Sequence, residues 1–224
     1  MPGTDKTAFR MIIKICGMKD PENIRIIAGL GPDIMGFVFY PPSPRYVGKE
    51  FSPEITTGLP CTIGKAGVFV NDSTDRMLQA REKFGLDYLQ LHGEESVAVC
   101  RKLKKNGAKV IKAFQVGEGF EFRQLKVWHE HCSMFLFDSQ SRGRGGSGHC
   151  FNWDLLCRYD LPVPFLLSGG IGSENIRKAL RLTHPMFAGV DLNSRLEIMP
   201  GIKSVALTEN IIHTIRDHEQ HSSR

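Results

Sequence analysis

The 224-residue sequence predicts a single (β/α)₈ barrel of the α/β class. Short runs rich in β-branched and aromatic residues recur every ~20–30 residues, which is the length of one strand–helix unit. Most of these runs are continuously apolar, as expected of parallel strands that are buried on both faces. The alternative, an open doubly wound sheet, needs only about five or six strands. The eight runs found here favour the closed barrel: Met11–Cys16, Asp33–Phe39, Lys65–Val70, Leu86–Leu91, Lys109–Phe114, Ser133–Asp138, Pro164–Ser168 and Met186–Asp191.

Helical segments are expected between the strands. Asp20 followed by Pro21 predicts an N-cap and a first helical position that lead into Glu22–Ala28. The segment Lys49–Gly58 predicts a weak helix at most. The remaining helical segments are Asp75–Phe84, Glu95–Lys105, Gln124–His131, Ser173–Leu182 and Lys203–Arg216.

The domain organisation expected is one catalytic domain. The sequence contains no internal repeat and no linker, so the barrel is expected to occupy residues 11–217. Residues 1–10 and 218–224 are expected to be loose tails. A folded chain of this size buries roughly 70% of the surface that it exposes when unfolded, so its core needs neither disulfides nor a structural metal.

The composition narrows the class of protein. Hydrophobic residues make up 41% and charged residues 24%, a globular balance. No apolar run approaches the ~18 residues of a spanning helix, and the polar N-terminus does not look like a secretory signal, so no membrane contact and a cytoplasmic location are expected. The net charge of +5 is too weak and too dispersed to indicate nucleic acid, but it suits an anionic small molecule. Six cysteines without a Cys-x-x-Cys pair predict reduced thiols and no zinc site.

Polar residues gather where the predicted strands end. In a barrel of this kind, functional residues lie at the C-terminal ends of the strands. Cys16 ends the first strand, and strand period two places Lys14 on the same face, where its ammonium would favour a thiolate able to act as a base or nucleophile. The alternative for Cys16 is a small core hydrophobe. Asp138 ends an otherwise apolar run, and its burial would raise its pKa and let it donate a proton, unless it only caps the next segment.

A phosphate site is predicted after the last two strands. Gly169, Gly170 and Gly172 precede a helix expected to begin near Ser173, and backbone N–H groups at such a position bind phosphate. An ordinary glycine turn is the alternative. The pair Asn193-Ser194 after the last strand favours phosphate, because barrels often bind it between these two loops.

Three further side chains are candidates for substrate contact. Arg45, in a proline-stiffened loop, could bind a carboxylate with two hydrogen bonds or could be a solvated surface residue. Gln90 and His92 share a strand face, and both could point into the site, although a structural role for His92 is equally open. The glycine-rich segment Ser139–Cys150 predicts a functional loop over the site.

Taken together, these positions resemble the phosphoribosylanthranilate isomerase family of tryptophan biosynthesis. The matching motifs occur in the family's order and span the chain from Met11 onward. They are Lys14-Ile15-Cys16-Gly17, Gly36-Phe37-Val38-Phe39, Ser43-Pro44-Arg45-Tyr46-Val47, Gly67-Val68-Phe69, Gln90-Leu91-His92-Gly93, Phe137-Asp138, Gly145-Gly146-Ser147-Gly148, Ser168-Gly169-Gly170-Ile171 and Gly189-Val190-Asp191.

The resemblance implies a (β/α)₈ barrel that carries out the Amadori rearrangement of N-(5-phosphoribosyl)anthranilate to 1-(2-carboxyphenylamino)-1-deoxyribulose 5-phosphate. It implies Cys16 as general base, Asp138 as general acid and Arg45 as the partner of the anthranilate carboxylate. It also implies a site lined by Gln90, His92 and Asp191, and a phosphate grip formed by Gly169, Gly170, Asn193 and Ser194.

The reaction expected from the resemblance consists of proton transfers, so neither a cofactor nor a metal is expected. The chain differs from the family at Asn193, Ser194 and Arg195, where two serines and a glycine are usual. The alternatives are another phosphosugar isomerase or epimerase barrel, and a non-catalytic barrel that only binds phosphate. The protein is expected to act as a monomer or a homodimer on this phosphosugar–anthranilate substrate.

Overall fold

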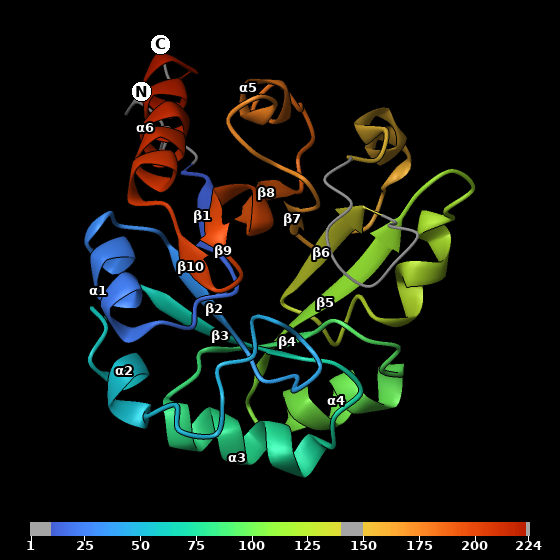
Figure 1. The fold of residues 1–224 in the computed structure, drawn as a ribbon. Helices are drawn as coiled ribbons and strands as arrows, with labels where there is room; N and C mark the ends of the chain where they lie inside the picture. The colour runs from blue at the N-terminus through green and yellow to red at the C-terminus, as the bar shows by residue number, and fades with distance from the viewer. Residues whose placement is uncertain (1–9, 140–149, 223–224) are drawn as a thin grey trace, which may run out of the picture.

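The computed structural model describes residues 10–139 and 150–222, and it shows eight parallel strands closed into a barrel in sequence order (Figure 1). Strand β8 pairs with β1, with Ile12 opposite Gly189 and Lys14 opposite Asp191, and this pairing closes the ring. The predicted fold class is confirmed, and each predicted strand is present. The strands are β1 Ile12–Ile15, β2 Ile34–Val38, β3 Gly64–Phe69, β4 Tyr88–Leu91, β5 Lys109–Val116, β6 Met134–Ser139, β7 Phe165–Leu167 and β8 Phe187–Leu192.

Helices surround the barrel on its outside (Figure 1). The first begins as predicted, since the Asp20 carboxylate accepts a hydrogen bond of 2.8 Å from the Asn23 amide and Pro21 takes the first helical position. The α-helices are α1 Pro21–Gly29, α2 Pro53–Thr57, α3 Thr74–Phe84, α4 Val97–Lys105, α5 Ile176–Ala179 and α6 Val205–Ser222. The 3₁₀ helices are η1 Phe122–Val127, η2 Trp153–Arg158 and η3 Ser194–Leu196.

Two predicted helices are corrected by the structure. The segment Gln124–His131 is largely replaced by the 3₁₀ helix η1, whose Phe122 is buried and packs against Phe137 of β6. The segment Ser173–Leu182 contains only the four residues of α5, which begins at Ile176. The Asn175 side chain accepts a hydrogen bond of 2.9 Å from the Gly172 amide, which holds the preceding residues in a turn.

Two features beyond the predicted elements affect the site and the C-terminus. An antiparallel hairpin, β9 Glu197–Met199 and β10 Ile202–Lys203, follows β8. Helix α6 continues to Ser222, beyond residue 217, where the barrel was expected to end. Arg216 of this helix donates to the Asp33 carboxylate at 2.6 Å and to the Met11 carbonyl, so α6 is fastened beside the start of β1. In the part of the chain that the structure describes, no helix has the length and apolarity needed to span a bilayer.

The core has two parts, because strand residues alternate between the barrel interior and the layer under the helices. A small cluster fills the interior, and a much larger one lies between strands and helices. This explains the continuously apolar runs. Above the interior cluster, at the C-terminal ends of the strands, Cys16 packs with Val38 and Val68. Fully buried charged side chains begin at the same level, so the site is expected at this end of the barrel. The interior cluster consists of Ile34, Ala66, Ile111, Ala113, Met134, Leu136, Leu166 and Ala188.

Candidate active site

A buried ion pair lies at the C-terminal end of the barrel interior. Lys14 of β1 has no exposed surface, and its Nζ donates to Asp191 Oδ1 of β8 at 2.6 Å. The other oxygen of Asp191 accepts a hydrogen bond of 3.1 Å from the Ser168 hydroxyl, which follows β7. Burial alone would lower the pKa of Lys14, but the Asp191 carboxylate and the Cys16 sulfur outweigh it, so the pKa is raised. Lys14 is therefore a fixed cation within the barrel.

The Cys16 thiol lies next to this cation. A methyl group placed on Gly36 would lie 2.8 Å from Cys16 Sγ and 3.1 Å from Lys14 Nζ, so these two atoms are at most about 6 Å apart. Only glycine at position 36 leaves room for both. Burial raises the pKa of the Cys16 thiol, and the Lys14 ammonium acts in the opposite direction. The predicted attraction between Lys14 and a thiolate is present, but it is smaller than the effect of burial.

Asp138 joins a short polar chain on the opposite side of the barrel. Its Oδ2 lies 3.3 Å from His92 Nε2, and His92 Nδ1 lies 2.9 Å from Gln90 Nε2. Asp138 Oδ1 accepts a hydrogen bond of 2.9 Å from the Ser139 amide. The sequence predicted a buried carboxyl group, but the Asp138 side chain is 25% exposed. Gln90 Oε1 is buried and has no hydrogen-bond partner among the described residues.

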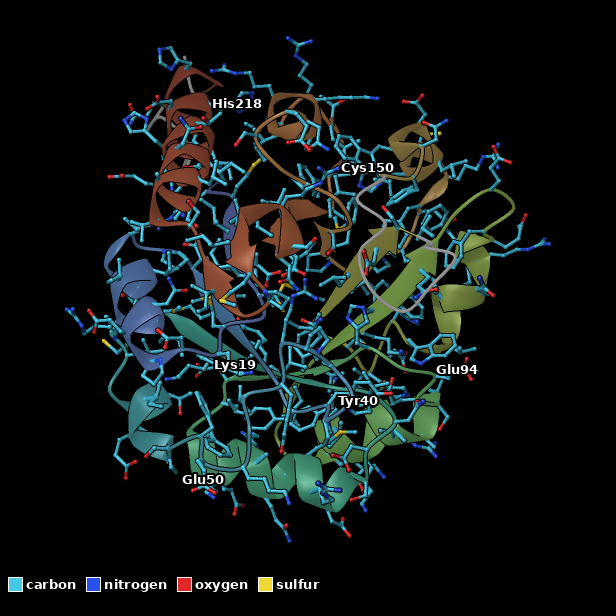
Figure 2. The ribbon with its side chains drawn as sticks, in the orientation of Figure 1. Lys19, Tyr40, Glu50, Glu94, Cys150 and His218 are labelled. Carbon is cyan, nitrogen blue, oxygen red and sulfur yellow. The ribbon has the colours of Figure 1, made fainter. Side chains whose placement is uncertain are left out.

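Gly169 explains how the loop after β7 approaches this carboxyl group. Its φ of +88° lies in the left-handed region that favours glycine. A Cβ at this position would lie 2.6 Å from Asp138 Oδ1 and 2.4 Å from Ser139 Oγ. The neighbouring thiol of Cys150, labelled in Figure 2, donates to the Gly169 carbonyl at 3.2 Å. The β7 loop is therefore closely fitted against the end of β6.

The loops after β7 and β8 meet, as the predicted phosphate site requires. A Cβ on Gly172 would lie 3.0 Å from Arg195 Cβ, and the Arg195 guanidinium lies 3.4 Å from the Glu174 carboxylate. Ser194 begins the 3₁₀ helix η3. The helix expected from Ser173 is corrected, because α5 begins at Ile176 and has only one turn. The predicted phosphate position is therefore bordered by two adjacent loops and not by the N-terminus of a long helix.

Arg45 binds a carboxylate of the protein itself. Its Nε and Nη2 donate to the two oxygens of Glu197 at 2.8 and 2.6 Å. Glu197 also accepts from Lys203 Nζ at 2.9 Å, and Lys203 donates to Asn193 Oδ1 at 2.7 Å. Glu197 and Lys203 are not among the predicted site residues, because they lie in a hairpin that the sequence did not predict. Lys203 was predicted to begin the last helix, which starts at Val205 instead. The Pro200-Gly201 turn was the signal available for that hairpin.

The structure thus brings the predicted residues to one end of the barrel, although they come from different strands and loops. The predicted loop Ser139–Cys150 falls mostly on residues 140–149, which lie outside the described residues. Within the described ranges, no group of three or more His, Cys, Asp or Glu side chains is arranged to hold a metal ion. The arrangement of a thiol, a carboxyl group and two adjacent loops suits proton transfers on an anionic ligand.

Comparisons with known proteins agree on one family. The family described as N-(5'phosphoribosyl)anthranilate (PRA) isomerase matches residues 13–214. A relative of that name from Phocaeicola vulgatus is 42% identical over 210 residues, which cover 94% of this chain and 100% of the relative. A second, from Parabacteroides distasonis, is 42% identical over 206 residues, covering 92% of this chain and 93% of the relative.

Solved structures give the same result. The phosphoribosyl anthranilate isomerase of Thermotoga maritima has a TM-score of 0.82 and 33% identity, covering 92% of this chain and 99% of its own. Another structure of such an isomerase contains reduced 1-(o-carboxyphenylamino)-1-deoxyribulose 5-phosphate, with a TM-score of 0.78 and 31% identity. It covers 92% of this chain and 99% of its own.

Proposed function

Because the chain belongs to the N-(5'-phosphoribosyl)anthranilate isomerase family and is an isomerase of tryptophan biosynthesis, we propose that Cys16 and Asp138 are its general base and general acid. The observation that carries this assignment is the position of the two groups at the same end of the barrel. Cys16 follows β1 beside a buried ammonium, and Asp138 lies in β6 beside an imidazole. A barrel that only binds phosphate would need neither group. A different phosphosugar isomerase or epimerase would leave Cys16 as a base unexplained.

Asp138 performs the first proton transfer. Its carboxyl group donates a proton to the furanose ring oxygen, the C1′–O bond breaks, and the anthranilate nitrogen supplies the electron pair that gives an iminium. The carboxylate that remains is stabilised by the Ser139 amide at 2.9 Å and by His92 Nε2 at 3.3 Å. With Gln90 Nε2 donating to His92 Nδ1, the ring proton lies on Nε2 and faces Asp138. Gln90 and His92 therefore orient the acid as well as line the site.

Cys16 performs the second proton transfer. Its thiolate removes the proton from C2′, and the electrons of that C–H bond neutralise the iminium to give an enolamine. The enolamine tautomerises to the ketone product. Lys14 stabilises the thiolate in a place where burial disfavours it, and Asp191 holds Lys14 in position. Glycine at position 36 keeps the thiol accessible to the ammonium.

The two ends of the substrate are held apart from the reacting carbons. Arg45 binds the anthranilate carboxylate, while Gly169, Gly170, Asn193 and Ser194 surround the phosphate. The contact between the β7 and β8 loops at Gly172 and Arg195 supports a phosphate position shared by these loops. Binding energy from these remote groups fixes the reacting carbon between acid and base. Both steps are proton transfers, so we expect activity without cofactor, in a cytoplasmic monomer or homodimer.

The experiment that tests the assignment measures turnover of the two alanine variants. Loss of the fluorescence of the anthranilate derivative follows the reaction. Cys16→Ala and Asp138→Ala should each lower kcat at least about 100-fold, the usual contribution of a positioned acid or base. Cys100→Ala, which removes a buried thiol of helix α4, and Asp154→Ala, in η2, should retain kcat. A variant of Cys16 or Asp138 with near-native kcat would show that the residue is assigned wrongly.

A further inference from the structure

A buried charge network surrounds the guanidinium of Arg45. The hairpin register places Glu197 of β9 opposite Lys203 of β10. Lys203 has no exposed surface, and the Glu197 side chain is 6% exposed. Glu197 accepts four hydrogen bonds: two from Arg45, one from Lys203 Nζ and one from the Gly201 amide at 3.0 Å. Its oxygens are therefore occupied within the protein.

The two hydrogen bonds from Arg45 to Glu197 use a single edge of the guanidinium. Nε and one hydrogen of Nη2 point to Glu197, and the arrangement fixes the plane of the group. The hydrogens of Nη1 and the second hydrogen of Nη2 lie on a different edge of the group. This edge can donate two parallel hydrogen bonds to the oxygens of a second carboxylate. Because Arg45 Cδ packs at 2.7 Å from the Cβ position of Gly17, the residue after Cys16, the arginine is held beside the base.

The net charge of the cluster formed by Arg45, Glu197 and Lys203 shows why Lys203 is needed to attract a carboxylate. Arg45 and Glu197 alone form a neutral pair, which would attract a further carboxylate only weakly. Lys203 adds a second cation, so the cluster carries one unit of positive charge in excess. The pKa of Lys203 is lowered, because the effect of burial exceeds the opposing attraction of the Glu197 carboxylate. The pKa of Glu197 is lowered in turn, because Arg45 and Lys203 outweigh the effect of its own burial.

The same lysine contacts the loop after β8. Its Nζ donates to the Asn193 side chain at 2.7 Å and to the Asn193 carbonyl at 3.3 Å. Asn193 Oδ1 lies 2.7 Å from the Cβ position of Gly17, as Arg45 Cδ does. One buried ammonium therefore connects the arginine expected at the carboxylate end of the substrate with the loop expected at its phosphate end.

We propose that Glu197 and Lys203 are specificity-determining positioning residues, which aim Arg45 at the substrate carboxylate and keep its surroundings net positive. Neither residue touches substrate in this proposal. The proposal rests on the proposed function in one respect, which is that Arg45 is the residue that binds the carboxylate.

The test compares two ligands on each variant. One is the reduced product analogue with its anthranilate carboxylate, and the other is the matching phenylamino compound without it. The ratio of their dissociation constants isolates the carboxylate, because any change in phosphate binding through Asn193 affects both ligands equally. A charge-assisted hydrogen bond contributes about 1.5–3 kcal/mol, which corresponds to a ratio of about 10–150 in the native protein.

Lys203→Met should reduce this ratio about 10-fold, and it should raise KM for substrate more than it lowers kcat. Glu197→Asp retains the charge but shortens the side chain, so it should also reduce the ratio, by withdrawing Arg45 from the carboxylate. In the Arg45→Ala background, Lys203→Met should change the ratio less than it does in the native protein, because only the charge of Lys203, and not its positioning of Arg45, can then contribute. The matched control is Lys112→Met, which removes another buried lysine paired with a glutamate and should leave the ratio unchanged.

A native ratio in both folded variants, Lys203→Met and Glu197→Asp, overturns the inference while leaving Arg45 in place. Circular dichroism establishes that each variant is folded, and Glu197→Asp decides the matter if Lys203→Met does not fold. A native ratio in Arg45→Ala is a different failure, because it removes the role proposed for Arg45 together with everything built on it.

Discussion

Replacing Lys14 by methionine should change the acid–base behaviour of Cys16 in a way that kinetics can measure. The ammonium favours the thiolate, so its removal raises the pKa of the thiol. At the upper limit of about 6 Å for their separation and an effective dielectric constant of about 20, the attraction amounts to at least about 3 kcal/mol, or about 2 pKa units. The carboxylate of Asp191 loses its partner in this variant. If Asp191 becomes neutral in this variant, it no longer disfavours the thiolate. The net rise in the pKa of the thiol then falls to about 1 unit.

The assay is the pH dependence of kcat/KM. In the proposed mechanism, the active form keeps the proton on Asp138 while Cys16 is ionised. The rate then has a level region that ends at high pH, and this alkaline limb reports the thiol. Since burial raises the pKa of the thiol, the native limb is expected above the ordinary range of cysteine. Lys14→Met should move it upward by about 1–2 units and lower the level region about 10- to 100-fold.

A buried carboxylate without its partner destabilises a protein by about 3–5 kcal/mol, so a second variant is needed. Lys14→Met combined with Asp191→Asn removes both charges and should still move the limb upward, because the effect of Lys14 on the thiol exceeds that of Asp191. Lys112→Met serves as the control, since it breaks the buried pair with Glu95 without contact to Cys16. An alkaline limb that stays in place, or moves to lower pH, in the folded double variant refutes the reasoning.

Three further outcomes are expected. Arg45→Ala should lose about 10- to 150-fold in affinity for the product analogue that carries the carboxylate and should bind the analogue without it about as the native protein does; isothermal titration measures both. Gly169→Ala should lower kcat and thermal stability together, because its φ of +88° is unfavourable for alanine and its Cβ would meet Asp138 Oδ1 at 2.6 Å; equal kcat in the two proteins would contradict the close fit of this loop. Leu103→Ala, in the fully buried face of α4, should destabilise by about 2–5 kcal/mol in urea titrations while leaving KM unchanged, since this packing is remote from the site.

The eight strands could be predicted from the sequence because both of their faces are buried, which requires the continuous apolar runs. The helix over Gln124–His131 was predicted wrongly, since Phe122 and Leu125 are buried and their packing, not helical periodicity, decides the local conformation. The hairpin was missed because its strands contain only three and two residues. Stretches this short show no measurable alternation of polar and apolar side chains.

The candidate residues at strand ends were predictable for a different reason. Strand parity alone places Lys14 and Cys16 on one face, and a barrel brings every strand end to one rim. Glu197 had no such signal. Its burial follows from an ion pair with Arg45, a residue 152 positions earlier in the chain, so its local sequence is that of an ordinary surface loop. Partnerships of this kind become visible only when the chain is folded.

Three fully buried lysines share one structural role at this end of the barrel. Lys14 contacts Asp191 at the end of β8, and Lys203 contacts Asn193 and Glu197 beyond it. Lys112 of β5 donates to the Gly93 carbonyl at 2.7 Å and to Glu95 at 3.1 Å, which holds the segment that follows His92. A buried ion pair adds little to stability compared with apolar residues of the same size. These ion pairs position the loops instead. An ammonium that donates to several fixed acceptors holds a loop in one position without bulky side chains packed against it. In the proposed mechanism, the segments that carry the histidine beside the acid, the partner of Arg45 and the phosphate contacts are thereby held without filling the space that the substrate must occupy.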